Sequence, residues 1–543
     1  MSDDNVGTVE HCCSSTTTTT NIRDIAVEDT PLVMNSEVEQ HNTTEEDFIP
    51  VCFCNSWSHS FTSNFFLFLS CLAALCQDAN DIAVPLTILQ PFFWLGFAIF
   101  TYAERTRLVI GWLLVIIARA IPAMDYFFYD TTRMVAYATA LVVIFLVYLF
   151  IGGAILVQVL WWRHHLQASS FVFATLLTAL FQVLFRASPI GGAGNPAMNL
   201  GRVIGLRQVA SLGGEISLVF GMAWTASLAA EILLLRKMPR RILYTWAAVT
   251  SVLLVYGWAR ENVGLGLYLR GINRWPLAQA PVLQVSCLTR SLDSNRETMI
   301  ARTQERMVAG DDIIMWSETA VLEPVAWDDF DWSRAPNPGT VIAATFFDNT
   351  SVVKNEKVYN SVAIWNAQGL VSEYSKNRPV PVVEYNVSRG EHLPTVVGLE
   401  LTPLDPVSGK RKSVYRKFAM SICFDLDFDY LSRHAHQADL MIGPSWYWAS
   451  IGSTMWHHNS FRAIENGFHL VKCSERGISG HLDAHGRVMN AIPTLENDIH
   501  VMEVPLTEGI KTVYSSFGFI FGWICVGLAP LLLGYIWWHV RQL

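Results

Sequence analysis

The chain has 543 residues, of which 51% are hydrophobic and only 16% are charged. Soluble proteins carry about a quarter charged residues, so this composition indicates several membrane spans rather than one large soluble core. The net charge of −9 and the lack of a basic stripe argue against a nucleic-acid partner.

Residues 1–58 are polar, acidic and rich in serine and threonine, with five consecutive threonines at Thr16–Thr20. Such a segment cannot bury enough apolar surface to fold by itself. It also lacks the basic start and early apolar core of a secretory signal. The sequence therefore predicts a disordered N-terminal tail.

The region 59–262 is dominated by seven apolar stretches, several of which approach the ~20 residues that cross a bilayer. A further apolar stretch lies within residues 514–540. We therefore expect a polytopic α-helical membrane domain with about eight spans. The expected spans are 61–77, 82–103, 108–124, 134–162, 169–185, 215–235, 242–259 and 515–538.

Basic residues gather in alternate connections between these spans. Arg105 and Arg107 follow the second span, Arg163 follows the fourth, and the basic segment 236–241 joins the sixth and seventh. By the positive-inside rule, these connections face the cytoplasm. Eight spans then place residues 260–514 outside the cytoplasm, in a lumen or the extracellular space.

Residues 278–508 have a different pattern. Short runs rich in β-branched residues, such as Val282–Val285 and Val341–Phe346, alternate with helical stretches at 294–309 and 456–467. This alternation indicates an α/β domain of about 230 residues.

Three polar residues of this region could carry chemistry. Glu318 comes soon after the apolar run 313–316, Cys423 ends the run 417–423, and Lys376 lies between them in sequence. Each has a plainer explanation, because a single cysteine is most often a small buried hydrophobe and a lone glutamate or lysine is usually solvated. Acyl transfer, however, needs a nucleophile, a base and an oxyanion stabiliser, and a thiol, a carboxylate and an ammonium supply them.

The order Glu318, Lys376, Cys423 resembles the carbon–nitrogen hydrolase (nitrilase) superfamily. The stretch 380–385, Val-Pro-Val-Val-Glu-Tyr, is similar to that of its membrane branch, the apolipoprotein N-acyltransferases, as are 461–467 and 483–488. The resemblance covers most of residues 60–538 and implies an α-β-β-α sandwich for residues 278–508. The long Gly-rich connection 186–214 is similar to a family segment in its second half, and is otherwise expected to be a re-entrant or surface loop.

The resemblance also implies roles for individual residues. Cys423 is the nucleophile, Glu318 the general base and acid, and Lys376 the oxyanion stabiliser. Glu384 and Asp425 have supporting roles, although Asp425 stands where the branch usually has a glutamate. A possible substrate pocket, or an aromatic belt at the membrane interface, is formed by Trp446, Tyr447 and Trp448.

The expected function is transfer of a fatty acyl chain from a membrane phospholipid, through a cysteine thioester, to an amine. In the bacterial family, that amine is the N-terminus of an apolipoprotein. One alternative is a membrane-tethered amidase that uses water. Another, from a different class, is a transporter or receptor with an inactive hydrolase-like domain.

Several expected absences accompany this interpretation. We expect no cofactor and no metal, because no His/Cys group has zinc spacing, and no disulfide framework, because the 10 cysteines are scattered. The polar tail and two glycosylation sequons, at 349–351 and 386–388, favour a eukaryotic member of the family.

Overall fold

The computed structural model describes residues 56–542 except for 77–83, 128–132, 165–169, 193, 238–239, 270–279, 294, 349–357, 382, 406, 448–450 and 506. The sequon at 349–351, Trp448 and almost all of the predicted tail lie outside these residues. The tail's structure therefore stays a prediction.

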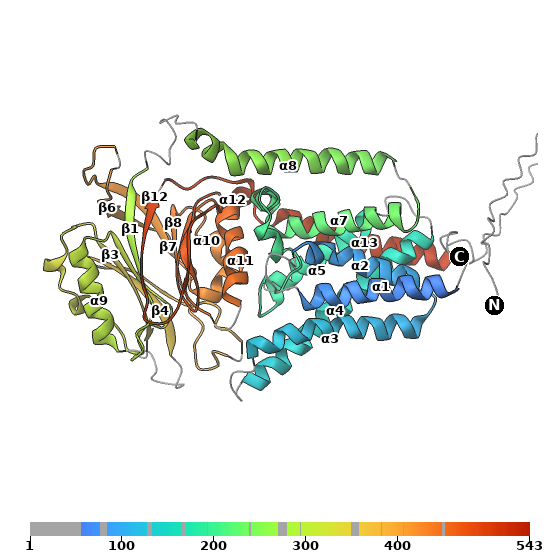
Figure 1. Ribbon diagram of the computed structural model, residues 1–543, viewed down its shortest axis with the longest axis horizontal. Helices are drawn as coiled ribbons and strands as arrows, with labels where there is room; N and C mark the ends of the chain where they lie inside the picture. The colour runs from blue at the N-terminus through green and yellow to red at the C-terminus, as the bar shows by residue number, and fades with distance from the viewer. Residues whose placement is uncertain are drawn as a thin grey trace, which may run out of the picture. The chain divides into compact units, whose positions relative to one another are not determined.

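Long apolar helices form one region of the described chain (Figure 1). Six of them contain stretches that are long and apolar enough to cross a membrane, which confirms a multi-span helical fold. Two further helices coincide with predicted spans but fall short of that standard: α1 has a 16-residue apolar part, Ser60–Leu75, and α3 carries Arg105, Arg107 and Arg119. The eight helices are α1 (Ser56–Leu75), α2 (Val84–Thr101), α3 (Arg105–Phe127), α4 (Arg133–Arg163), α5 (Ser170–Ala187), α7 (Glu215–Leu233), α8 (Arg240–Leu269) and α13 (Ile520–Gln542).

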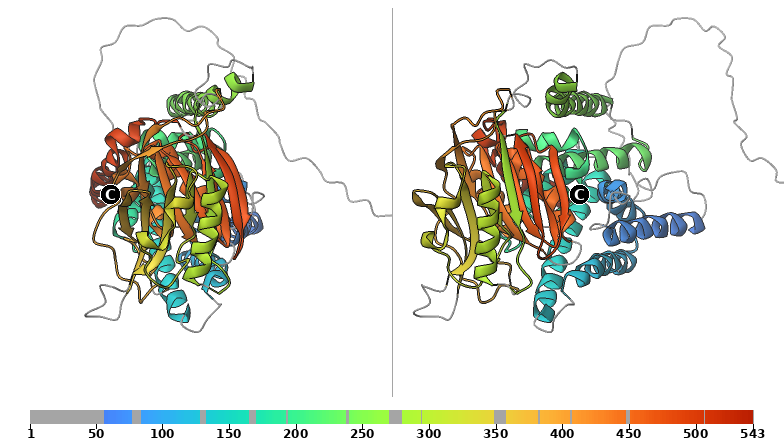
Figure 2. Two further views of the ribbon diagram at one scale, coloured as in Figure 1. Left: turned by 90° about the vertical axis from the view of Figure 1, so that its left-hand side faces the viewer. Right: turned by 60° about the vertical axis from the view of Figure 1, so that its left-hand side comes forward.

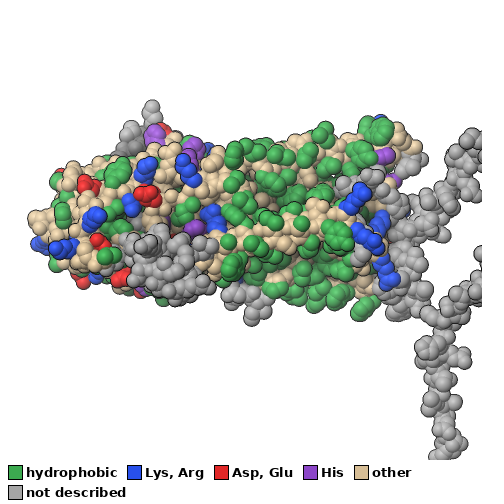
Figure 3. All heavy atoms as spheres, turned by 90° about the horizontal axis from the view of Figure 1, so that it is seen from above, with side chains coloured by type: hydrophobic (Ala, Val, Ile, Leu, Met, Phe, Trp, Pro, Cys, Tyr) green, Lys and Arg blue, Asp and Glu red, His purple; other side chains and the backbone are tan. Residues whose placement is uncertain are grey.

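The surface of these helices is apolar. Large side chains such as Phe150, Val255 and Leu531 are more than half exposed, which suits contact with lipid rather than water. Figure 3 shows this apolar surface beside the mixed polar surface of the strand region. A helix satisfies its own backbone hydrogen bonds, so it is the form in which such sequences can enter a bilayer.

The strand region is a pair of six-stranded sheets. The first sheet has the order β12-β1-β2-β3-β4-β5 and the second β11-β10-β9-β8-β7-β6. Its strands are β1 (Val282–Leu288), β2 (Ile313–Trp316), β3 (Val341–Asp348), β4 (Tyr359–Asn366), β5 (Gly369–Ser375), β6 (Val397–Leu401), β7 (Val414–Met420), β8 (Leu440–Trp446), β9 (His469–Glu475), β10 (Gly477–Leu482), β11 (Val488–Thr494) and β12 (Ile499–Pro505).

The two sheets lie face to face and carry helices on their outer faces, as expected for an α-β-β-α sandwich (Figures 1 and 2). The core between the sheets is built from both, with Val285 and Met315 on one side and Phe418 and Val471 on the other. Helix α9 (Arg296–Ala309) covers the first sheet. Helices α10 (Asp429–His434) and α11 (Ile451–Asn466) cover the second sheet, on the side of the membrane helices.

The expectation of no disulfide is wrong. Cys287 of β1 and Cys473 of β9 are bonded, with their Cα atoms 5.1 Å apart, and both are fully buried between the sheets. They lie 186 residues apart in sequence, so spacing gave no hint of the pairing. The bond joins the two sheets of the sandwich.

The connection between α5 and α7 packs between the membrane helices and the sandwich. It forms η3 (Met198–Arg202), η4 (Leu206–Val209) and α6 (Ala210–Gly213), and its polar residues Asn195, Asn199, Gln208 and Ser211 are buried. A Cβ atom on Gly201 would lie 2.6 Å from the carbonyl oxygen of His457 in α11, so a larger residue would separate the two segments. This connection is therefore largely buried between the two regions and is not an exposed loop.

Candidate active site

The structure brings Glu318, Lys376 and Cys423 together at one edge of the sandwich. Glu318 comes shortly after β2 and Lys376 directly follows β5, both in the first sheet, while Cys423 follows β7 in the second. Strands β2 and β7 each have a parallel neighbour in their own sheet, and Glu318 and Cys423 each lie beyond the carboxyl end of these apolar strands. All three side chains are buried, with exposed fractions of 1–4%.

Lys376 is held between two carboxylates. Its Nζ atom donates to Glu318 Oε1 at 2.6 Å and lies 2.8 Å from Glu384 Oε2. Burial acts to lower the pKa of Lys376, but the negative charges of Glu318 and Glu384 outweigh it and raise that pKa well above its usual value. Lys376 therefore stays cationic although it is buried.

Glu318 is fixed by three donors. Besides Lys376, the Nδ2 atom of Asn360 donates to its Oε1 at 2.8 Å, and the backbone N–H of Trp446 donates to its Oε2 at 2.8 Å. The Trp446 bond crosses from the second sheet to the first. The carboxylate thus has one fixed orientation in front of Cys423.

Cys423 has a backbone conformation that favours glycine, with φ at +47°. A positive φ at a residue with a side chain costs of order 1–3 kcal/mol and is found mostly at functional sites. Its Sγ atom lies 3.5 Å from the carbonyl oxygen of Trp446. Burial, followed by the charge of Glu318, raises the pKa of the Cys423 thiol well above its usual value, so this side chain rests as a thiol and would need a base to react.

Asp425 anchors the segment that carries Lys376. Its carboxylate accepts from the Tyr374 hydroxyl at 2.7 Å and from the backbone N–H groups of Asn377 and Arg378 at 3.1 and 2.7 Å. Burial raises the pKa of Asp425 to about 6. Asp425 therefore ties the turn Cys423–Asp427 to the segment that follows Lys376.

The predicted aromatic pocket is partly described. Trp446 contributes backbone atoms to the site, and Tyr447 is 5% exposed, with its hydroxyl accepting from Lys472 Nζ at 2.7 Å. Trp448 lies outside the described residues.

Two residues of this site were not singled out from the sequence. Asn360 of β4 lies 2.8 Å from Glu318 and 3.5 Å from Glu384, and no motif marks it. Lys472 of β9 is fully buried, donates to Asn459 Oδ1 at 2.6 Å, and has a pKa lowered to about 8 by burial. The only signal for Lys472 was a charged residue in the middle of a strand, between Val471 and Cys473. Within the described residues, no group of three or more His, Cys, Asp or Glu side chains is arranged to hold a metal ion.

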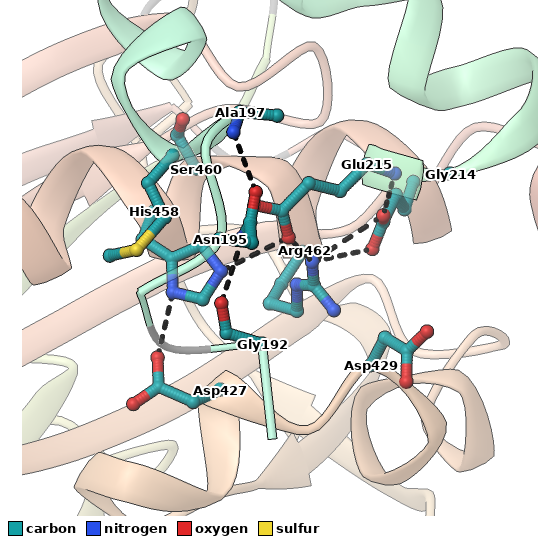
Figure 4. Close-up of polar contacts among 12 residues, drawn as sticks. Gly192, Asn195, Ala197, Gly214, Glu215, Asp427, Asp429, His458, Ser460 and Arg462 are labelled. Atoms are coloured by element: carbon teal, nitrogen blue, oxygen red, sulfur yellow. Dashed lines mark hydrogen bonds and ion pairs between the residues drawn. The ribbon is translucent and has the colours of Figure 1, made fainter. Parts of the chain in front are cut away.

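A buried polar cluster joins the turn Cys423–Asp427 to the membrane helices (Figure 4). His458 of α11 contacts Asp427 Oδ1 through Nδ1 at 2.8 Å and Glu215 Oε2 through Nε2 at 3.0 Å. Asp427 ends the turn that begins at Cys423, and Glu215 begins α7. Arg462 donates to the same Glu215 oxygen at 2.7 Å.

Further contacts close this cluster. The Glu215 backbone N–H donates to Glu465 Oε1 at 2.7 Å, and Asn195 of the α5–α7 connection donates to Glu215 Oε1 at 2.7 Å. The N–H of Gly192 donates to the carbonyl of Asp427 at 2.8 Å. The position of the turn Cys423–Asp427 is thereby fixed relative to the membrane helices.

Protonation of His458 should make the free energy of unfolding of this protein depend on pH. Burial acts to lower its pKa, but Glu215 and Asp427 raise it to about 9. A histidine with a raised pKa stabilises the fold fully below its unfolded value near 6.5, and this contribution is lost as the pH rises through about 9. We expect His458→Gln to lower stability by about 3 kcal/mol at pH 6 and by much less at pH 10.

The measurement is the thermal midpoint of the detergent-solubilised protein from pH 6 to 10, always as the difference between wild type and variant. That difference cancels other groups titrating in the same range, among them Glu465, whose pKa burial raises to about 8, and Lys472. The exposed His434→Gln serves as the matched control. A difference that does not shrink with rising pH would show that the charge of His458 is not what stabilises the cluster.

No family model matches the chain. Among curated proteins, it is 26% identical over 364 residues to the apolipoprotein N-acyltransferase of Pseudomonas putida, covering 61% of this chain and 66% of that protein. It is 33% identical over 127 residues to apolipoprotein N-acyltransferase 1 of Treponema denticola, covering 22% of this chain and 23% of that protein. The chain thus spans less than two thirds of the length of these relatives.

The chain also has matches that are named amidases. The deaminated glutathione amidase of Dictyostelium discoideum is 30% identical over 168 residues, covering 28% of this chain and 55% of that protein. A solved amidase from Nesterenkonia sp. aligns over 42% of this chain and 91% of its own, at 17% identity and a TM-score of 0.32. Several curated matches carry the name apolipoprotein N-acyltransferase, so this chain is similar to proteins of that family over up to 61% of its length.

Proposed function

We propose that this protein is an N-acyltransferase that moves a fatty acyl chain from a membrane phospholipid to an amine through a thioester on Cys423. The observation that carries the proposal is the buried constellation of Cys423, Glu318 and Lys376 in a chain with apolar helices suited to a bilayer. A thiol, a fixed carboxylate and a caged ammonium supply a nucleophile, a base and an oxyanion partner.

In the first half-reaction, Glu318 takes the thiol proton of Cys423 as sulfur attacks the ester carbonyl of the phospholipid. The Nζ atom of Lys376 donates to the oxyanion that forms. The carbon–oxygen bond then breaks, and Glu318 returns the proton to the departing lysophospholipid oxygen. A raised thiol pKa favours this concerted use of a base over a preformed thiolate.

In the second half-reaction, an amine attacks the thioester carbonyl. Glu318 accepts the proton that the amine nitrogen loses and delivers it to the departing sulfur of Cys423, which restores the thiol. Lys376 again stabilises the oxyanion. Relatives named apolipoprotein N-acyltransferases favour a lipoprotein N-terminus as the amine.

We also propose that the sandwich lies outside the cytoplasm. Figure 3 shows Lys and Arg side chains gathered at the end of the helical region farther from the strands, which is the cytoplasmic end under the positive-inside rule. The Cys287–Cys473 bond supports the same side, because disulfides persist in oxidising compartments.

The test is to incubate the purified full-length protein with a phospholipid labelled in its acyl chains, without acceptor, and to map acylated peptides by mass spectrometry. We expect a hydroxylamine-labile acyl group on Cys423, absent from Cys423→Ala and retained in Cys71→Ala, which removes another free cysteine. No adduct with any of several phospholipids would contradict the proposal.

An amidase remains the second candidate, because the Dictyostelium relative is named an amidase. Adding a synthetic peptide with an N-terminal S-diacylglyceryl cysteine to the acylated protein separates the two. Release of an N-acylated peptide supports acyl transfer. Release of free fatty acid at an unchanged rate, with or without the peptide, supports hydrolysis.

A further inference from the structure

Three arginines and two aromatic rings alternate where the membrane helices meet the sandwich. The guanidinium carbons of Arg378 and Arg186 each lie 5.5 Å from the ring centre of Tyr430. That of Arg186 lies 3.3 Å from the ring centre of Phe519, and that of Arg433 lies 5.3 Å from the same centre. We refer to these five residues as the arginine stack.

The arginine stack lies at the end of the apolar helices. Arg186 is in the last turn of α5, and Phe519 directly precedes α13, and both helices are candidate spans. Its five members are all partly exposed. This is the level at which the headgroups of a bilayer would meet the protein.

Positive charge exceeds negative charge in the contacts of the arginine stack. Arg186 pairs with Asp429 at 3.1 Å, and Arg433 donates to the carbonyl oxygen of Tyr514 at 2.9 Å, which carries no charge. Arg378 donates through Nε to the Tyr430 hydroxyl at 2.6 Å, and within the described residues no bond is made by its terminal nitrogens. Of the three arginines, only Arg186 thus pairs with a carboxylate in these contacts, and Arg378 retains donors.

This arrangement suits a phosphate. A guanidinium stacked on a ring keeps the N–H groups at its edge available, and its planar fork matches two oxygens of a phosphate group. The stack also adjoins the active site, because Arg378 is two residues from Lys376 and their Cα atoms lie within about 7 Å. Its backbone N–H is bonded to Asp425, which secures that segment.

We propose that the arginine stack binds the phosphate of a glycerophospholipid headgroup, with Arg378 as the main contact, and so presents the lipid's ester to Cys423. This inference rests on the proposed function and deepens it, because it makes the negatively charged headgroup a determinant of donor choice. A neutral diacylglycerol with the same acyl chains would lack the contact.

The experiment compares these two donors in the acylation of Cys423 by the full-length protein. We expect Arg378→Gln to reduce kcat/KM for the phospholipid about ten- to a hundredfold, as for the loss of a hydrogen bond to a charged group, and to leave the diacylglycerol rate unchanged. Arg378→Lys keeps the positive charge, and its kcat/KM for the phospholipid should lie between those of the wild type and Arg378→Gln. Arg334→Gln, an exposed arginine paired with Asp331, is the matched control.

Equal losses for both donors would overturn the headgroup assignment and make Arg378 a residue that only supports Lys376. Adding inorganic phosphate to the acylation assay distinguishes a free-anion site from a headgroup site. If phosphate inhibits acylation of the wild type by phospholipid but not by diacylglycerol, the headgroup assignment is supported. Equal inhibition with diacylglycerol overturns it in favour of a free-anion site.

If neither donor acylates the wild type, the proposed function fails but the site can still be tested. Native mass spectrometry then counts phospholipids retained by each variant. Loss of one bound phospholipid in Arg378→Gln, with none lost in Arg334→Gln, would support the site independently, and equal retention would overturn it.

Discussion

Glu318→Gln should stop phospholipid from acylating Cys423 while making the same thiol easier to alkylate. The acylation step loses its base, and we expect its rate to fall about 10²- to 10⁴-fold. The thiol, meanwhile, loses a neighbouring negative charge that raises its pKa, second only to burial, and keeps the positive charge of Lys376. A larger thiolate fraction should therefore react with iodoacetamide at a pH near neutrality.

Both rates can be measured on one preparation, by intact mass for acylation and by peptide mapping for alkylation. Glu323→Gln is the matched control, because Glu323 is exposed in the segment after the same strand. A parallel fall in both rates would mean that the substitution at Glu318 had only disordered the site. Acylation at the wild-type rate would remove Glu318 from the proposed mechanism.

Removing the bond between Cys287 and Cys473 should cost about 2–4 kcal/mol of stability. A disulfide that closes a loop of 186 residues strongly restricts the unfolded chain. For a domain of this size, the thermal midpoint should fall by about 5–15 °C. Activity should fall with it, because the bond joins the sheet that carries Glu318 and Lys376 to the sheet that carries Cys423.

The double variant Cys287→Ser and Cys473→Ser is compared with Cys71→Ser and Cys76→Ser, which changes two free cysteines in α1 and at its end. The readout is the thermal midpoint of the detergent-solubilised protein, with and without a reductant, which reaches the buried bond once the chain unfolds. Equal midpoints for the two double variants would refute a stabilising role for the disulfide.

The sequence was enough to predict the residues that meet at the candidate active site. Glu318, Lys376 and Cys423 each lie at or just beyond a strand, where polarity changes abruptly, and their order in the chain matches a family pattern. The helices were predictable because a bilayer demands long apolar stretches. The α-β-β-α layers followed from the resemblance, since alternation of strands and helices alone indicates only an α/β domain.

What the sequence could not reveal are contacts between segments that are distant along the chain. Cys287 and Cys473 become partners only when two sheets face each other. His458 and Glu215 are 243 residues apart, and neither lies in a pattern that predicts the other. Asn360 contacts Glu318 because β4 and β2 lie on either side of β3, which no local signal encodes.

The cluster around His458 has a consequence for attempts to make this enzyme smaller. A fragment that begins at residue 278 would keep the α-β-β-α sandwich and lose most of the apolar helices. It would also lack Glu215 and Asn195, so that Arg462, Glu465 and His458 would lose their contacts with Glu215 at the start of α7. Buried charges that lose a partner are strongly destabilising. The bilayer-facing half is therefore part of the enzyme's scaffold, and the free fragment should be a poor substitute for the intact protein in inhibitor screening or crystallisation.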